Sequence, residues 1–138
     1  MLTKYKYVFM LGRPGCGKSA VYRKLEKRLK EENLASSFER VDDFPKLWNK
    51  FVTDDKLQKE GKPRVYSRPT DDGGYKVTND AVWNDILKEV NADILKINKG
   101  AGHIVFIEFS RSNYIEALSN FDKKILANCL AIYIDVSF

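Results

Sequence analysis

Apolar residues gather in four short runs of the chain, and these runs predict β-strands. The stretches "YKYVFML" at 5–11, "HIVFIEF" at 103–109 and "LAIYIDV" at 130–136 are nearly continuous and rich in β-branched and aromatic side chains. This pattern is typical of strands that are buried on both faces in a parallel sheet. The stretch "SSFERV" at 36–41 is more polar and predicts a further strand, which ends next to two aspartates.

The segments between these runs show apolar residues at helical spacing. From about Gly17 onward, Val21, Leu25 and Leu29 fall on one face, and lysines and arginines occupy the remaining faces. Strands that alternate with helices predict an α/β fold in three α/β/α layers, with a mostly parallel sheet of at least four strands. The other two helical stripes comprise Trp83, Leu87, Val90, Ile94 and Ile97, and Tyr114, Leu118, Phe121 and Ile125.

The segment 44–77 departs from this alternation, because prolines and glycines are interspersed there with many charged residues. We expect an irregular insertion, with a short helix through Leu47 and Phe51 and an extended loop after it. Long irregular insertions in compact domains are often binding loops or lids, and a disordered segment is the alternative. The whole chain, 1–138, is predicted to be a single domain, since its length suits one core.

Charge and composition narrow the function classes only partly. The formal net charge is +5, and positive potential attracts phosphorylated small molecules and nucleic acids alike. The two cysteines, Cys16 and Cys129, come without a secretory signal, which favours a reduced, cytoplasmic protein. No membrane partner is expected, because no apolar run approaches the roughly 20 residues that span a bilayer. The sequence leaves the oligomeric state open.

The stretch "GRPGCGKS" at 12–19 predicts a phosphate-binding loop. It matches the pattern of a glycine, four residues and then Gly-Lys-Ser, and it lies between the first predicted strand and the first predicted helix. Glycines allow backbone N–H groups to turn inward around a phosphate, and the helix N-terminus adds further donors. Lys18 supplies a cation for the outer phosphates, and the Ser19 hydroxyl is a ligand for Mg²⁺. The expected nucleotide-binding set is Gly12, Arg13, Pro14, Gly15, Cys16, Gly17, Lys18, Ser19 and Ala20.

Glu108 is the acidic residue near the end of the third predicted strand. Ligands of open α/β sheets bind at the carboxyl ends of the strands, so we expect Glu108 to hold Mg²⁺ or to polarise an attacking group. The structural alternative is a carboxylate that caps or pairs with Arg111 at the strand end. Arg111 and Arg13 are also candidates for clamping phosphate oxygens, because a guanidinium group binds them through two parallel hydrogen bonds.

Asp42 and Asp43 follow the second predicted strand and belong to the same edge of the sheet. A carboxylate in this place can accept the proton of an acceptor hydroxyl, which is the general-base role in phosphoryl transfer. Adjacent side chains diverge, so we expect one of the two to face the site and the other to cap the next helix. A capping role for both is the alternative.

Two short stretches partly resemble the motifs by which GTPases recognise guanine nucleotides, but neither matches them. The stretch "DDGG" at 71–74 does not follow an apolar strand, as a GTPase switch would require. The stretch "NKGA" at 98–101 has an alanine where a guanine-binding carboxylate is needed. Guanine recognition therefore has no support in the sequence.

Four motifs together, "GRPGCGKS", "RVDDF", "FIEFSR" and "YIDVSF", resemble the core of the P-loop nucleoside, nucleotide and polynucleotide kinases. The resemblance implies a P-loop NTPase fold, ATP and Mg²⁺ as cofactors, and transfer of the γ-phosphoryl group to a hydroxyl or phosphate of a small molecule, nucleoside or nucleotide. It implies that Asp42 is the general base, with Asp43 as the second choice. It also implies that Lys18 and Ser19 have the roles of the phosphate-loop lysine and serine. Glu108 with Arg111 is similar to the acidic and arginine elements near deoxynucleoside-kinase acceptor sites.

The resemblance has one departure. In these kinases the last of the four motifs leads into an arginine-bearing lid and usually a fifth strand, whereas the sequence ends at Phe138. Lid arginines stabilise charge on the transferred phosphoryl group. Because the sequence ends before such a lid, we expect it to bind a nucleotide but to turn over weakly. The alternative function is a non-catalytic nucleotide-binding module or an NTPase with a signalling or regulatory role. Nucleic acid is a further possible partner, but a small-molecule or nucleotide-like acceptor is favoured.

Overall fold

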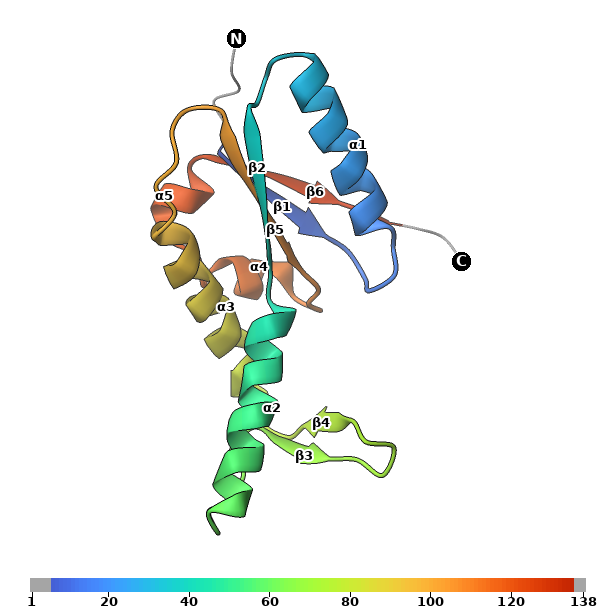
Figure 1. The fold of residues 1–138 in the computed structure, drawn as a ribbon, viewed down its shortest axis with the longest axis vertical. Coiled ribbons are helices and arrows are strands. Elements are labelled where there is room, and N and C mark those ends of the chain that lie inside the picture. The colour runs from blue at the N-terminus through green and yellow to red at the C-terminus, as the bar shows by residue number, and fades with distance from the viewer. Residues whose placement is uncertain (1–5, 136–138) are drawn as a thin grey trace.

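A parallel sheet of four strands lies at the centre of the molecule (Figure 1). The structure is a computed structural model, and it describes residues 6–135. The elements are β1 (Tyr7–Leu11), α1 (Lys18–Glu31), β2 (Ser37–Asp42), α2 (Phe44–Lys59), β3 (Ser67–Pro69), β4 (Tyr75–Val77), α3 (Ala81–Leu95), β5 (His103–Phe109), α4 (Tyr114–Leu118), α5 (Lys123–Leu126) and β6 (Cys129–Tyr133). The sheet has the order β2-β5-β1-β6, and β3 pairs with β4 in a separate antiparallel hairpin.

Both faces of the sheet are covered by helices, which confirms the predicted α/β/α layers. Successive residues of β1 point to opposite faces because side chains alternate along a strand. Phe9 packs with residues of α3, α4 and α5, whereas Met10 belongs to the core beneath α1, and both side chains are fully buried. Burial on both faces accounts for the continuous apolar run of β1, as it does in other parallel sheets.

The carboxyl ends of three strands meet at one edge of this sheet. Glu108 of β5 lies opposite Met10 of β1 on one side and Asp42 of β2 on the other. The chain leaves β1 toward the face that α1 covers, and it leaves β5 toward the face that α4 and α5 cover (Figure 1). The two connections diverge between β1 and β5, and this is where open α/β sheets form their binding crevice.

The segment 44–77 is more regular than the sequence suggests. Its first half forms α2, a helix of 16 residues, and its second half contains the β3–β4 hairpin, so the expected irregular insertion is wrong for these parts. Pro45 lies in the first turn of α2, where a missing N–H does not interrupt the helix. In Figure 1, β2 leads directly into α2, which projects beyond the sheet and carries the hairpin beside it.

The last helical stripe and two strand ends also differ from expectation. The stripe at 114–125 is divided between α4 and α5, because Asp122 caps α5 by accepting a hydrogen bond from the Lys124 N–H at 2.8 Å. Strand β6 ends at Tyr133, and the expected strand residue Val136 lies outside the described residues, as does Tyr5. Between residues 6 and 135, no helix is both long enough and apolar enough to cross a membrane.

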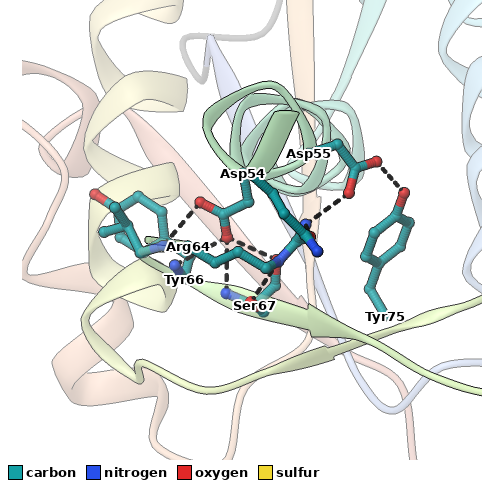
Figure 2. A network of polar contacts seen from close by, with 8 residues as sticks. Asp54, Asp55, Arg64, Tyr66, Ser67 and Tyr75 are labelled. Carbon is teal, nitrogen blue, oxygen red and sulfur yellow. Dashed lines mark hydrogen bonds and ion pairs between the residues drawn. The ribbon is translucent and has the colours of Figure 1, made fainter. Parts of the chain in front are cut away.

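A buried carboxylate connects α2 to the loop that precedes the hairpin (Figure 2). Asp54 is fully buried, and Figure 2 shows its side chain pointing from α2 toward this loop. It accepts hydrogen bonds from the N–H groups of Val65, Tyr66 and Ser67 at 3.0, 2.9 and 2.8 Å, and from the Ser67 hydroxyl at 2.7 Å. Nearby, Asp55 binds Arg64 at 2.7 Å and also accepts a hydrogen bond from the Tyr75 hydroxyl. These bonds hold the hairpin against α2.

Candidate functional site

The glycine-rich loop joins β1 to α1 at the edge where the strand ends meet. Gly17 adopts a left-handed conformation with φ of 94° immediately before the helix, which favours glycine because a Cβ is strained there. Gly17 has no side chain to cap α1, so the first N–H groups of this helix remain available to an anion. Arg13, Ser19 and Ala20 are exposed around this position, as are Pro14 and Gly15.

Gly12 is held in a confined place at the start of the loop. Its φ is 147°, and its N–H donates to the Tyr114 hydroxyl at 3.0 Å. A Cβ at this position would lie 2.7 Å from both the Cys16 sulfur and the Ile134 carbonyl oxygen. Cys16 is buried directly against Gly12, so it fills the base of the loop, away from the exposed residues around it.

Replacing Gly12 with alanine is expected to lower the free energy of unfolding by about 2–4 kcal/mol, because an added methyl group meets backbone and sulfur atoms that cannot move aside freely. Thermal or urea denaturation measures the loss. Gly100→Ala is the matched control, since its Cβ would meet no heavy atom within 4 Å. Equal stability of the two variants would contradict the tight packing of Gly12.

Lys18 extends over the loop toward β5. Its ammonium group donates to the carbonyl oxygens of Gly12 and Arg13 at 2.8 and 3.2 Å, and to the Ser110 hydroxyl at 2.9 Å. Ser110 in turn donates to the Gly12 carbonyl oxygen. These three acceptors match the three N–H donors of a lysine, so the cation is fixed at the entrance of the loop.

The two aspartates at the end of β2, Asp42 within the strand and Asp43 directly after it, have different environments. Asp42 accepts a hydrogen bond from the Phe44 N–H at 2.8 Å, so it caps the start of α2. Asp43 forms an ion pair with Arg111 at 2.7 Å, and their side chains are only 14% and 12% exposed. Both aspartates line a cavity of about 270 Å³ that also contains Lys18 and Glu108. Asp43, the second choice from sequence, is the more buried carboxylate and the one bound to an arginine.

Burial raises the pKa of Asp43 above its ordinary value of 3.8, and the neighbouring Arg111 offsets this effect only in part. Asp42 contributes in the same direction, because a second carboxylate disfavours ionisation of the first. A raised pKa makes a carboxylate a better proton acceptor near neutral pH, which suits a general base.

Arg111 is held by several partners besides Asp43. It donates to the carbonyl oxygens of Ser110 at 2.8 Å and of Trp83 at 3.2 Å, and its guanidinium carbon lies 5.1 Å from the centre of the Trp83 ring. The buried Nε has no hydrogen-bond partner among residues 6–135. The alternative in which Arg111 pairs with Glu108 is therefore wrong, and Arg111 acts first as the anchor of Asp43.

Glu108 pairs instead with Arg40 of β2. The Arg40 Nη2 donates to Glu108 Oε1 at 2.6 Å and to the Ser19 hydroxyl at 3.2 Å. The two groups expected to hold Mg²⁺ are thus bonded to one guanidinium nitrogen. Among residues 6–135, no three His, Cys, Asp or Glu side chains come together as a metal-binding group either. Ser19 and Glu108 as arranged here do not fit a protein-bound magnesium ion.

A larger cavity of about 480 Å³ is also lined by Arg111. It is lined mainly by polar side chains from the start of α3 and from the segment between β5 and α4. Asn84 donates to Glu116 at 3.1 Å within this lining, and Asn120 donates to Asn84 at 2.9 Å. The lining residues are Asp80, Trp83, Asn84, Ser110, Arg111, Ser112, Asn113, Glu116 and Ala117.

Three contributors to this site were not anticipated from the sequence. Ser110 and Tyr114 bind the phosphate loop from the far side of the sheet edge, and Arg40 binds Ser19 and Glu108. Ser110 directly follows the end of a predicted strand, so its position in the sequence could have indicated that it belongs to the site. Arg40 lies within a strand, where its side chain gave no indication of the neighbour across the sheet.

Comparison with known proteins supports the fold. The sequence matches no protein-family model, and no curated protein matches it. The structure is similar to that of APE1195, with a TM-score of 0.50 and 20% identity over 99% of this chain and 64% of that chain. It is also similar to the signal recognition particle receptor FtsY from Elizabethkingia anophelis, with a TM-score of 0.40 and 20% identity over 94% of this chain and 42% of that chain.

This chain therefore spans less than two thirds of either neighbour. At such identities the likeness to APE1195 shows a shared fold, and the likeness to FtsY is weaker still. The glycine-rich loop between β1 and α1, set at the edge of a parallel sheet with helices on both faces, makes this a P-loop NTPase-like fold.

Proposed function

We propose that the chain is an ATP-dependent phosphotransferase of the P-loop kinase type. One observation supports this proposal above the others: a single cavity is lined both by Lys18 of the phosphate loop and by the Asp43–Arg111 pair. A phosphate-binding cation and a buried carboxylate of raised pKa are the two groups that transfer to a hydroxyl requires.

The loop residues and Lys18 would bind the β- and γ-phosphates, through backbone N–H groups and the ammonium group respectively. Asp43 would accept the proton of the acceptor hydroxyl while that oxygen forms a bond to the γ-phosphorus. The bond between this phosphorus and the bridging oxygen breaks, and ADP leaves with the electron pair. Arg111 keeps the Asp43 carboxylate in place during the step, because two further hydrogen bonds, to the carbonyl oxygens of Ser110 and Trp83, fix the guanidinium.

The acceptor would enter the 480 Å³ cavity beside Arg111. Asp80 and Glu116 are carboxylates in this lining, while its arginine is already paired with Asp43. A phosphate on the acceptor would meet two carboxylates and no unpaired lining cation, whereas hydroxyl or amino groups would find acceptors and amides. This favours an unphosphorylated small molecule or nucleoside over a nucleotide.

Transfer from ATP labelled at the γ-phosphate to a panel of nucleosides, sugar alcohols and amino alcohols tests the proposal. We expect Asp43→Asn to lower the single-turnover rate by about 10²–10⁴-fold, with ATP affinity unchanged, because only proton transfer is lost. Asp42→Asn is the control, and we expect a much smaller effect because Asp42 caps α2. Activity of the unmodified chain should fall as pH drops through the raised pKa of Asp43, since transfer needs its ionised form.

The opposite ranking of the two aspartates would contradict the assignment of Asp43. Release of inorganic phosphate with no labelled acceptor in the panel would favour the NTPase alternative. Tight ATP binding without any cleavage would favour a nucleotide-binding module.

A further inference from the structure

Arg40 brings a positive charge to the place where P-loop proteins are expected to hold a metal ion. A single nitrogen of its guanidinium group touches both expected metal ligands, the Ser19 hydroxyl at 3.2 Å and the Glu108 carboxylate at 2.6 Å. These three residues come from α1, β2 and β5, so the contact depends on the fold and not on local sequence.

The guanidinium group is firmly held in this position. The distance of 2.6 Å to Glu108 is that of a charge-assisted hydrogen bond, and the Glu108 side chain is only 10% exposed. The Arg40 guanidinium carbon also lies 4.5 Å from the centre of the Tyr22 ring, which adds a cation–π contact. A nearly buried carboxylate that loses its cation is left uncompensated, so Arg40 is not displaced easily.

Magnesium could not share these contacts. Mg²⁺ requires oxygen ligands at about 2.1 Å in nearly octahedral geometry, and it gives up its water molecules reluctantly. Glu108 Oε1 already accepts a short hydrogen bond from the Arg40 guanidinium, which is positively charged like Mg²⁺. The Ser19 oxygen accepts a hydrogen bond from the same guanidinium. Within residues 6–135, Nε and Nη1 of Arg40 have no hydrogen-bond partner, so their N–H groups are available to a phosphate. The Arg40 side chain is 34% exposed beside the start of α1.

We propose that Arg40 is the resident cation of the phosphate site, which neutralises nucleotide phosphates in place of a magnesium ion bound by Ser19 and Glu108. This inference rests on the proposed nucleotide-binding function of the loop. Its consequence is that ATP binds to this chain with little dependence on magnesium, and that removal of Arg40 creates that dependence.

The test is ATP titration by calorimetry in two buffers, one with excess Mg²⁺ and one with EDTA, for the unmodified chain and for Arg40→Gln. For the unmodified chain, we expect the two affinities to agree within about tenfold. For Arg40→Gln, we expect affinity in EDTA to fall by about 10–100-fold and to recover in Mg²⁺, because Ser19 and Glu108 are then released. Arg23→Gln, an exposed arginine on α1, is the matched control and should behave as the unmodified chain does.

Binding of Mn²⁺ to the nucleotide-free protein, followed by electron paramagnetic resonance, gives a second readout that needs no ATP. We expect Arg40→Gln to gain a Mn²⁺ site that the unmodified chain lacks, and a further Glu108→Gln change to remove it. A Mn²⁺ site in the unmodified chain that depends on Glu108 would overturn the inference, as would unmodified-level behaviour of Arg40→Gln in both buffers.

The failure of this inference is distinguishable from failure of the proposed function. If the unmodified chain binds ATP only in Mg²⁺ while Lys18→Ala binds none, the phosphate loop is functional and only the role of Arg40 is wrong. If the unmodified chain binds no ATP in either buffer, the proposed function falls, and the role of Arg40 falls with it.

Discussion

Replacing Lys18 with alanine is expected to weaken ATP binding by about 100-fold or more, because it removes charge-assisted hydrogen bonds worth roughly 1.5–3 kcal/mol each and 1.4 kcal/mol is a factor of ten. The Lys18 ammonium lies over the loop, where it binds the Gly12 and Arg13 carbonyl oxygens and the Ser110 hydroxyl. Phosphate oxygens that enter the loop would replace some of these oxygen atoms as hydrogen-bond acceptors of the Lys18 ammonium group, which would stay in place. Calorimetric titration of ATP measures the change in affinity.

Two controls separate loss of binding from loss of structure. Lys24→Ala removes an exposed lysine from the same helix and should leave the affinity unchanged, because this residue lies outside the loop. Circular dichroism and urea denaturation should show that Lys18→Ala remains folded, since Lys18 is only half-buried. ATP affinity that is the same with and without Lys18 would show that the glycine loop is only a tight turn.

Replacing Asp54 with asparagine is expected to lower the free energy of unfolding by about 3 kcal/mol, because hydrogen bonds to a buried charged group are lost and an amide N–H₂ then faces other donors. Asp54 accepts one hydrogen bond from each of three consecutive N–H groups and one from the Ser67 hydroxyl (Figure 2). Urea denaturation followed by tryptophan fluorescence measures the loss. Trp48 on α2 reports on the same region.

The pH dependence of this difference provides a further check. Burial alone would raise the pKa of Asp54, but the Ser67 hydroxyl and the three N–H groups outweigh it and lower the pKa below its ordinary value of 3.8. The carboxylate therefore stabilises the fold above pH 3.8, and this stabilisation is lost as the pH falls through the lower folded-state pKa. The stability gap between the unmodified chain and Asp54→Asn should close over that range. A gap that persists in acid would contradict the role of the charge.

Asp55→Asn is the matched neighbour for this experiment. Asp55 binds Arg64 and Tyr75, but its side chain is 38% exposed, so water can replace the lost partners. We expect a much smaller loss of stability than for Asp54→Asn. Comparable losses would show that the charge, and not its burial, decides the effect.

The sheet and its covering helices were predictable because burial on two faces leaves a direct trace in the sequence. The runs around β1 and β5 are almost continuously apolar, which is the pattern of strands that a parallel sheet buries on both faces. Segment 44–77 was harder, since Pro45 usually signals a break and yet lies in the first turn of α2. Asp54 gave no signal at all, because its partners follow 11 to 13 residues later and form only when the chain turns back.

The phosphate loop was predictable because its chemistry lies in eight consecutive residues, at 12–19. The partners across the sheet were not, since β2 and β5 are far apart in the chain and their register decides which side chains meet. The sequence suggested a pair between Glu108 and Arg111 because both lie near the end of one strand. In the structure, Arg111 pairs with Asp43 and Glu108 pairs with Arg40. Local spacing thus identified the charged groups but not their pairing.

The order of strands in the sheet also has a consequence for biosynthesis. The central strand β1 is made early in translation, yet both of its neighbours, β5 and β6, come about 90 to 120 residues later. At about 5–20 residues per second, β1 waits several seconds or longer before either partner is made. During this time five apolar residues, all buried in the finished fold, have no strand to pair with. The nascent chain is therefore most exposed to aggregation and most dependent on chaperones in the interval before β5 is complete.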